Sequence, residues 1–236
     1  MPNNIGPFTP GPDDTETAGL IAGDCFQLAQ DIPDGSIDLI YTDPPYTTNT
    51  LYIFDWLGVE APRLLRPGGL VFAYAGTYFL EKIMRALASN LTFHWLFSVD
   101  LDGGNPYFRA RQILNCSRLI VAYSNGPAAP HLYLRDRLRS EGKDKSIHEW
   151  QQAVQPARYW IERVSKAGDL ILDPFAGSGS FLAAARSCGR RYLGFEIDPQ
   201  YIAPARARIL ATPIKPYLPG IEMATQELPF PEAADG

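Results

Sequence analysis

The chain has 236 residues, of which 46% are hydrophobic and 20% are charged, a length and composition typical of one globular α/β domain rather than a disordered chain. No apolar run reaches the roughly 18 residues that span a bilayer, and the three cysteines, Cys25, Cys116 and Cys188, lack the spacing of a disulfide framework or a zinc site. The formal net charge of -5 does not exclude a polyanionic partner, because the charges are unevenly distributed. We expect a soluble protein of the reducing cytoplasm with no metal and no membrane partner.

The two ends of the chain differ in composition from the middle. Residues 1–17 and 213–236 are rich in proline and show no apolar periodicity, so we expect extended tails there. Residues 18–212 alternate short apolar runs with helical stretches and are expected to form the folded domain.

Within this domain, strands are predicted at 37–42, 70–74, 93–99, 118–123, 169–172 and 192–196, and helices at 53–65, 78–89, 156–166, 180–188 and 199–210. The segment Arg66-Pro67-Gly68-Gly69 is expected to end the first helix. Several strands are apolar at successive positions, as expected for strands that helices cover on both faces. The alternation predicts an α/β fold with a doubly wound, mostly parallel sheet.

The first motif ends the strand 37–42 with the sequence Asp43-Pro44-Pro45-Tyr46. An exocyclic amino group of a nucleobase is a poor nucleophile, because its lone pair is delocalised into the ring. Two acceptors aimed at its hydrogens, the Asp43 carboxylate and the Pro44 carbonyl, would stabilise positive charge that develops on the nitrogen. Proline fixes φ and so holds its carbonyl rigidly, and Tyr46 would stack on the base. Alternatively, prolines at this position simply end a strand and begin a turn.

The second motif is a buried strand that leads into the glycine turn Asp173-Pro-Phe-Ala-Gly-Ser-Gly179 and then a helix. Such a turn brings the backbone close to a ligand and offers free N–H groups. A dinucleotide fingerprint would need glycine at position 182, which is Leu182. The next strand ends in Glu196, placed to accept hydrogen bonds from ribose hydroxyls. Together these features predict a nucleoside-containing ligand, and S-adenosylmethionine satisfies the requirements.

These two motifs resemble those of the amino-methylating DNA methyltransferases, and their order resembles the permuted β arrangement of that family. The resemblance covers roughly residues 20–209 and implies a Rossmann-like, S-adenosylmethionine-dependent domain with a small target-recognition insert near residues 100–150. It implies catalytic roles for Asp43, Pro44, Pro45 and Tyr46. The implied cofactor-binding residues are Asp24, Cys25, Asp43, Gln151, Asp173, Phe175, Ala176, Gly177, Ser178, Gly179, Glu196 and Ile197.

The family resemblance also bears on the target base. Cytosine-N4 enzymes of this arrangement usually carry serine where this chain has Asp43, so the resemblance favours adenine-N6 in DNA. Cytosine-N4 methylation of DNA, methylation of RNA, and a catalytically silent DNA-binding subunit remain as alternatives.

The insert is basic. Residues 106–147 contain eight basic and three acidic side chains, a balance of +5, so the remainder of the chain is near -10. A solvated surface helix of mixed charge would also explain such a run. Because the insert lies where the family has its target-recognition region, the resemblance favours contact with double-stranded DNA. The arginines expected to bind DNA are Arg109, Arg111, Arg135, Arg137 and Arg139. The short insert suggests a short recognition sequence or help from a second subunit, which leaves a homodimer open.

Overall fold

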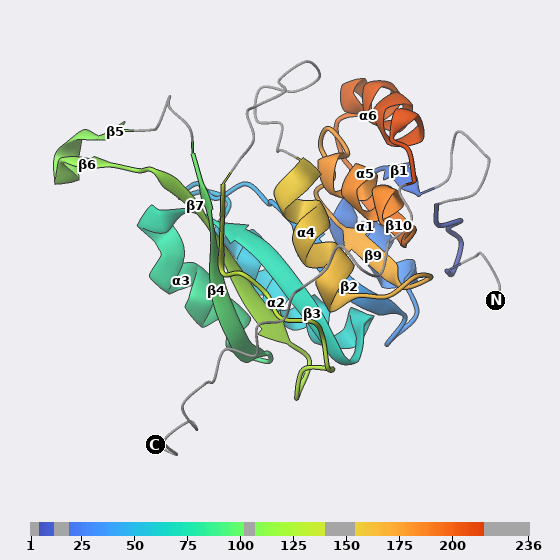
Figure 1. The fold of residues 1–236 in the computed structure, drawn as a ribbon, viewed down its shortest axis with the longest axis horizontal. Coiled ribbons are helices and arrows are strands. Elements are labelled where there is room, and N and C mark those ends of the chain that lie inside the picture. The colour runs from blue at the N-terminus through green and yellow to red at the C-terminus, as the bar shows by residue number, and fades with distance from the viewer. Residues whose placement is uncertain (1–4, 12–18, 102–106, 140–153, 215–236) are drawn as a thin grey trace.

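A computed structural model describes residues 5–11, 19–101, 107–139 and 154–214, which form one domain around an eight-stranded sheet (Figure 1). In spatial order the strands are β1 (Leu20–Ala22), β10 (Arg191–Glu196), β9 (Leu170–Asp173), β2 (Ile37–Thr42), β3 (Leu65–Ala75), β7 (Ser117–Ser124), β4 (Thr92–Asp100) and β8 (Arg137–Arg139). The α-helices are α1 (Cys25–Leu28), α2 (Tyr52–Leu64), α3 (Leu80–Leu87), α4 (Val154–Val164), α5 (Ser180–Ser187) and α6 (Pro199–Ala211).

The sheet is mostly parallel, and β7 alone among these strands runs antiparallel to its neighbours β3 and β4. The direction of chain connection reverses between two neighbouring strands, β9 and β2. From β9 the chain continues to β10 on one side, and from β2 it continues to β3 on the other side. The carboxyl ends of β9 and β2 therefore flank a topological switch point, where ligands bind in doubly wound sheets.

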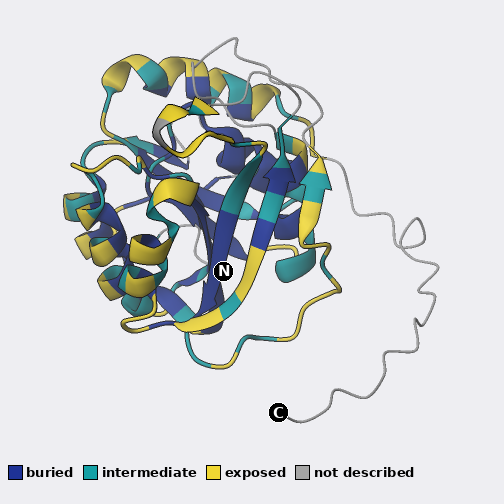
Figure 2. Cartoon of the chain, turned by 90° about the vertical axis from the view of Figure 1, so that its left-hand side faces the viewer, coloured by how far each residue is buried: buried dark blue, intermediate teal, exposed yellow. Residues whose placement is uncertain are grey.

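Helices cover both faces of the sheet. Alternate residues of β3 enter two separate cores: Leu70, Phe72 and Tyr74 pack with α4, α5 and α6, whereas Val71 and Ala73 pack with α1, α2 and α3. Figure 2 shows the buried central strands between helices whose outer faces are exposed. This two-sided burial explains the continuous apolar runs in the sequence and confirms the doubly wound fold class.

The predicted elements recur with small shifts. Helix α2 ends at Leu64, just before the segment predicted to end it, and residues 66–69 already belong to the next strand. They form an irregularity within β3, because Leu65 pairs with Ile37 and Leu70 pairs with Leu39. Gly68 adopts φ +77° there, a conformation that suits glycine. The sequence analysis missed β1, α1, β8, and the hairpin of β5 (Tyr107–Phe108) and β6 (Ile113–Leu114).

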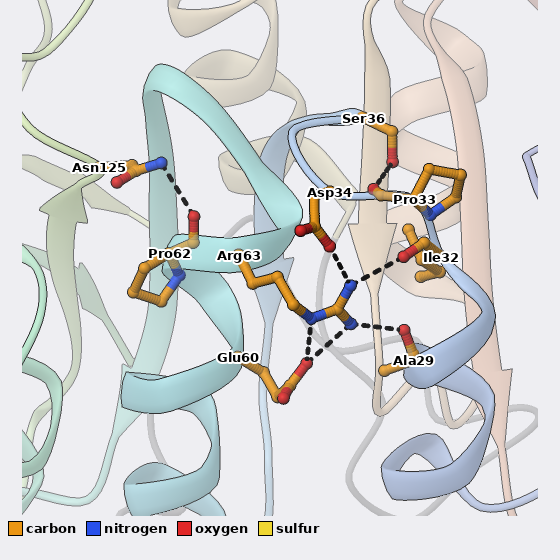
Figure 3. Close-up of polar contacts among 9 residues, drawn as sticks. All are labelled: Ala29, Ile32, Pro33, Asp34, Ser36, Glu60, Pro62, Arg63 and Asn125. Carbon is orange, nitrogen blue, oxygen red and sulfur yellow. Dashed lines mark hydrogen bonds and ion pairs between the residues drawn. The ribbon is translucent and has the colours of Figure 1, made fainter.

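A hydrogen-bonded arginine joins α2 to the segment that precedes β2 (Figure 3). The Arg63 guanidinium donates to Glu60 and Asp34 and also to the carbonyl oxygens of Ala29 and Ile32, over 2.7–3.0 Å. This arginine therefore joins the carboxyl-terminal end of α2 to the segment between α1 and β2.

Residues 5–11 pack onto the domain. The Phe8 ring is buried and lies 5.4 Å from the ring of Phe195, and Gly11 forms an antiparallel bridge to Tyr192. Among the described residues, no helix combines the length and apolarity needed to cross a membrane.

Candidate functional site

A cleft of about 690 Å³ opens at the carboxyl ends of β1, β10, β9 and β2. Its size is that of a small-molecule or cofactor site. Apart from Arg118 near the start of β7, the residues around it come from the carboxyl ends of these four strands, from the segments that follow them and from helices α1 and α2. They are Gly23, Asp24, Cys25, Phe26, Asp43, Pro44, Pro45, Tyr46, Thr47, Thr50, Tyr52, Ile53, Arg118, Pro174, Phe175, Phe195, Glu196 and Ile197.

The tetrapeptide Asp43 to Tyr46 leaves the end of β2 and forms one wall of this cleft. The Thr50 hydroxyl donates to the carbonyl oxygen of Pro45 over 2.9 Å and accepts from the Thr47 N–H over 2.8 Å, which fixes the loop after the tetrapeptide. The Tyr46 ring lies against Gly76, where a β-carbon would approach the ring to 2.5 Å. Burial and the nearby Asp43 carboxylate raise the pKa of the Tyr46 phenol, which stays protonated.

Asp173 ends β9 beside the tetrapeptide. Its Oδ1 accepts from the Thr42 hydroxyl over 2.8 Å and from the Phe175 N–H over 3.1 Å. Burial is the main cause that raises the pKa of this carboxyl from 3.8 to about 7, and the charges of Asp43 and Glu196 contribute. The other oxygen, Oδ2, is buried and has no hydrogen-bond partner among the described residues, and Asp173 itself does not line the cavity.

The glycine turn is held by Glu196 at the end of β10. Its Oε2 accepts from the Gly177 N–H over 2.7 Å, and its Oε1 accepts from the Asp198 N–H over 2.8 Å. Each oxygen keeps a lone pair for a ligand hydroxyl. Gly179 has φ +71°, and a β-carbon there would come within 2.9 Å of Ile209 in α6. The turn therefore requires glycine for both conformation and space.

Behind the turn, Ser178 faces α6 rather than the cleft. The Arg208 guanidinium donates to the hydroxyls of Ser178 and Ser180 over 3.2 and 2.6 Å. Ser178 and Ala176 are buried, and Ala176, Gly177, Ser178 and Gly179 do not line the cavity. These predicted residues therefore shape the turn that borders the cleft.

The opposite wall comes from the β1–α1 connection. The Asp24 side chain accepts from the Phe26 N–H over 2.9 Å and caps α1. Burial raises the pKa of the Cys25 thiol to about 12, so this cysteine is an uncharged lining residue and not a nucleophile. The Phe26 ring lies 5.9 Å from Tyr52 and 4.8 Å from Trp56. Aromatic walls and carboxylates with spare acceptor capacity fit the adenosine and cationic parts of the predicted cofactor.

The structure thus brings together Asp24, Cys25, Asp43, Pro44, Pro45, Tyr46, Phe175, Glu196 and Ile197 at one cavity, with Asp173 directly behind. Gln151 lies outside the described residues.

The five arginines expected to bind DNA are all exposed. Arg109 and Arg111 form the 3-10 turn η3 (Arg109–Arg111) at the tip of the β5–β6 hairpin, and Arg111 lies 4.8 Å above the Tyr78 ring. Arg137 and Arg139 are on β8, and Arg137 pairs with Asp100 over 2.8 Å. Between residues 107 and 139 the structure contains no α-helix, so the alternative of a solvated helix is wrong for this part of the insert.

Among the cleft residues that the sequence analysis did not predict, Arg118 is the charged one. It is the second residue of β7 and is half-buried. In the sequence it is one of eight basic residues of the insert, and the pairing of β7 between β3 and β4 is what places it beside the tetrapeptide.

Comparisons with known proteins give one consistent result. Residues 131–207 match the model of the N6/N4 methyltransferase family, described as DNA methylase. The YubD protein of Escherichia coli (strain K12), a methylase by name, is 28% identical over 208 residues, covering 81% of this chain and 90% of that protein. Among solved structures, the M1.HpyAVI–SAM complex (TM-score 0.68, 20% identity, 81% of this chain and 98% of the other) is similar in fold. So is the cytosine-N4-specific PvuII DNA methyltransferase (TM-score 0.68, 18% identity, 80% and 85%).

Proposed function

We propose that the chain is an N6/N4 DNA amino-methyltransferase, in keeping with its similarity to that family's model and to YubD, and that it transfers a methyl group from S-adenosylmethionine to the N6 amino group of adenine in double-stranded DNA. The observation that supports this most directly is the shared cleft, because the Asp43 to Tyr46 loop and Glu196 both line one cavity. A cofactor held at Glu196 and a base stacked on Tyr46 would then meet beside Asp43.

The residues of the loop have separate parts in the proposed reaction. When bound, S-adenosylmethionine supplies an electrophilic methyl group attached to a positively charged sulfur. The Asp43 carboxylate and the Pro44 carbonyl accept the two hydrogens of the target amine, which directs its lone pair at the methyl carbon. Methyl transfer would form the new N–C bond as the S–C bond of the cofactor breaks, with S-adenosylhomocysteine as the leaving group, and the amine would release one proton to solvent. Tyr46 holds the flipped-out base by stacking.

Two observations bear on the choice of base. Asp43 stands where cytosine-N4 enzymes of this arrangement usually have serine, which favours adenine. The fold is as similar to that of the cytosine-N4-specific PvuII enzyme as it is to that of M1.HpyAVI, with a TM-score of 0.68 for each. Cytosine-N4 is therefore the second candidate. A homodimer stays a prediction, which sedimentation of the purified chain would measure.

The test is product analysis. Purified protein is incubated with unmethylated plasmid DNA and methyl-labelled S-adenosylmethionine, and the DNA is digested to nucleosides. We expect labelled N6-methyldeoxyadenosine, and Asp43→Ala should lower the rate roughly a hundredfold or more while cofactor binding largely persists. Labelled N4-methyldeoxycytidine alone would move the target to cytosine. Transfer to RNA but not to DNA, or binding of DNA without any transfer, would overturn the proposal.

A further inference from the structure

We infer that Arg118 recognises the flipped-out target base by donating hydrogen bonds to a ring nitrogen beside the reactive amine. This inference rests on the proposed function and assigns a base-reading residue to its site. No catalytic role is assigned to Arg118, because a guanidinium cannot stabilise the positive charge that develops on the amine.

The order of strand ends along the sheet edge places Arg118 at the substrate end of the cleft. From the cofactor side, the edge presents Glu196 on β10, Asp173 on β9 and Asp43 after β2. Next comes Gly76 after β3, with the Tyr46 ring against it. The following strand is β7, whose Leu119 pairs with Ala75 of β3. Arg118 is therefore one strand beyond Tyr46, and Asp43 separates it from the cofactor end.

Arg118 shares the cavity with the loop that would hold the base. Both Arg118 and the Asp43 to Tyr46 loop line the cleft. The positive charge of Arg118 also acts on the phenols of Tyr46 in this loop and of Tyr74 in β3, since it lowers the pKa of both against the larger effects of burial and Asp43. A base stacked on Tyr46 would lie within reach of the half-buried guanidinium.

The chemistry of the bases fits such a donor. Arginine offers only N–H donors. In adenine and cytosine, the ring nitrogen next to the exocyclic amine on the pairing edge is an acceptor. In guanine and thymine, the corresponding ring nitrogen carries a hydrogen and would oppose the guanidinium. Arg118 would thus admit a base whose amine faces Asp43 and reject those with a donor at the neighbouring ring position.

The experiment compares Arg118→Met with the wild type on two duplex oligonucleotides that carry the mapped target sequence. One holds the natural base, and the other replaces the ring nitrogen beside the amine with C–H, as 1-deazaadenine or 3-deazacytosine. We expect the Met variant to raise KM for natural DNA about tenfold with kcat changed by less than about threefold, the size of one lost charged hydrogen bond. The wild type should lose a similar factor on deaza DNA, and the variant should treat both duplexes alike.

Three further measurements keep the result decisive. Arg118→Lys should recover part of the affinity, and Arg85→Met, at an exposed pair on α3, should match the wild type. Calorimetry with S-adenosylmethionine should show unchanged affinity for Arg118→Met, which also reports that the variant is folded. Equal sensitivity of wild type and variant to the deaza base overturns the inference, as does a tenfold loss of cofactor affinity. If the wild type methylates no DNA at all, the proposed function fails first.

Discussion

Asp43, Asp173 and Glu196 lie at three neighbouring strand ends, and the repulsion among their carboxylates favours a positively charged ligand. Burial is the main reason that the pKa of Asp173 stands at about 7, and the other two carboxylates add to it. A cation placed among them would be favoured, because it lowers the cost of ionising all three. The charges therefore suit a cofactor with a positively charged sulfur better than one with phosphates.

The raised pKa of Asp173 predicts a pH dependence of stability. In the unfolded chain this carboxyl ionises near pH 4, whereas in the folded chain it ionises near pH 7. Between these values the folded state binds more protons, so the free energy of unfolding falls as pH rises, by up to roughly 1.4 kcal/mol for each unit of the pKa difference.

Replacement by asparagine tests this dependence. Asp173→Asn keeps an acceptor for the Thr42 hydroxyl and the Phe175 N–H but cannot ionise. The difference in unfolding free energy between variant and wild type should therefore grow in favour of the variant from pH 4.5 to pH 7.5. Denaturant unfolding at several pH values measures it, and parallel curves for the two proteins would contradict the assignment.

The site residues that sequence reasoning found share one property. Asp43 to Tyr46, Asp173 to Gly179 and Glu196 each follow an apolar run that ends in an acid or a glycine turn, so a local pattern marks them. Arg118 has no such mark. It is the second residue of its strand and lies in the site only because β7 inserts antiparallel between β3 and β4, a long-range pairing that neighbouring residues do not encode.

At the scale of elements, helix α2 depends on a contact near its carboxyl end. Arg63 has 29% of its side chain exposed and satisfies two carbonyl groups of the preceding segment, whereas Arg85 on α3 forms an i,i+4 pair with Glu81 in which both side chains are about four-fifths exposed. The two arginines offer a matched comparison of a half-buried contact and a surface pair.

We expect Arg63→Ala to destabilise the domain by about 1–3 kcal/mol, because it removes charged hydrogen bonds and leaves carbonyl groups without their donors. Arg85→Ala should cost only about 0.2–0.5 kcal/mol, as is usual for exposed i,i+4 pairs. Urea unfolding of both variants measures the difference. Equal losses would show that the Arg63 contacts contribute no more than a surface pair.

The elements that the sequence analysis missed are short. β1 and β8 have three residues each, and α1 has four, lengths at which neither a period of two nor one of 3.6 can be recognised. Their structure follows from partners distant in sequence: β1 pairs with β10, and β8 with the end of β4. The longer strands and helices, each with a clear apolar pattern, were predicted to within a few residues.

At the scale of the whole molecule, the cleft and the exposed arginines share one edge of the sheet. β4 and β8 run parallel to β3 and end at the same edge of the sheet, so Arg139 lies at that edge, two strands beyond Arg118 in β7. The β5–β6 hairpin extends from the sheet near the β7 end of the molecule (Figure 1). The hairpin packs against the 3-10 turn Thr77–Phe79 that follows β3, because the Tyr78 ring lies 6.2 Å from the ring of Phe108 and 4.8 Å from the Arg111 guanidinium. A basic edge next to the cleft allows an acidic chain to bind a polyanion.

Replacing Arg135, Arg137 and Arg139 together by alanine should weaken DNA binding and flatten its salt dependence while leaving cofactor affinity unchanged. Each cationic contact to a phosphate of duplex DNA contributes about 0.9 to the slope of log affinity against log salt. The side chains of Arg137 and Arg139 lie on one face of β8, since they are two residues apart in a strand. Both can therefore approach the phosphate backbone of the same DNA strand.

The single variants separate the three positions. Arg137 pairs with Asp100, so its contact with phosphate competes with a carboxylate. Asp100→Asn should therefore tighten binding and steepen the salt slope, the reverse of Arg137→Ala. Arg85→Ala, near the end of α3, should leave the slope unchanged. Affinities measured at several salt concentrations decide the matter: a triple variant with the wild-type slope would show that DNA does not contact β8, and a loss of about one unit would assign the contact to a single arginine.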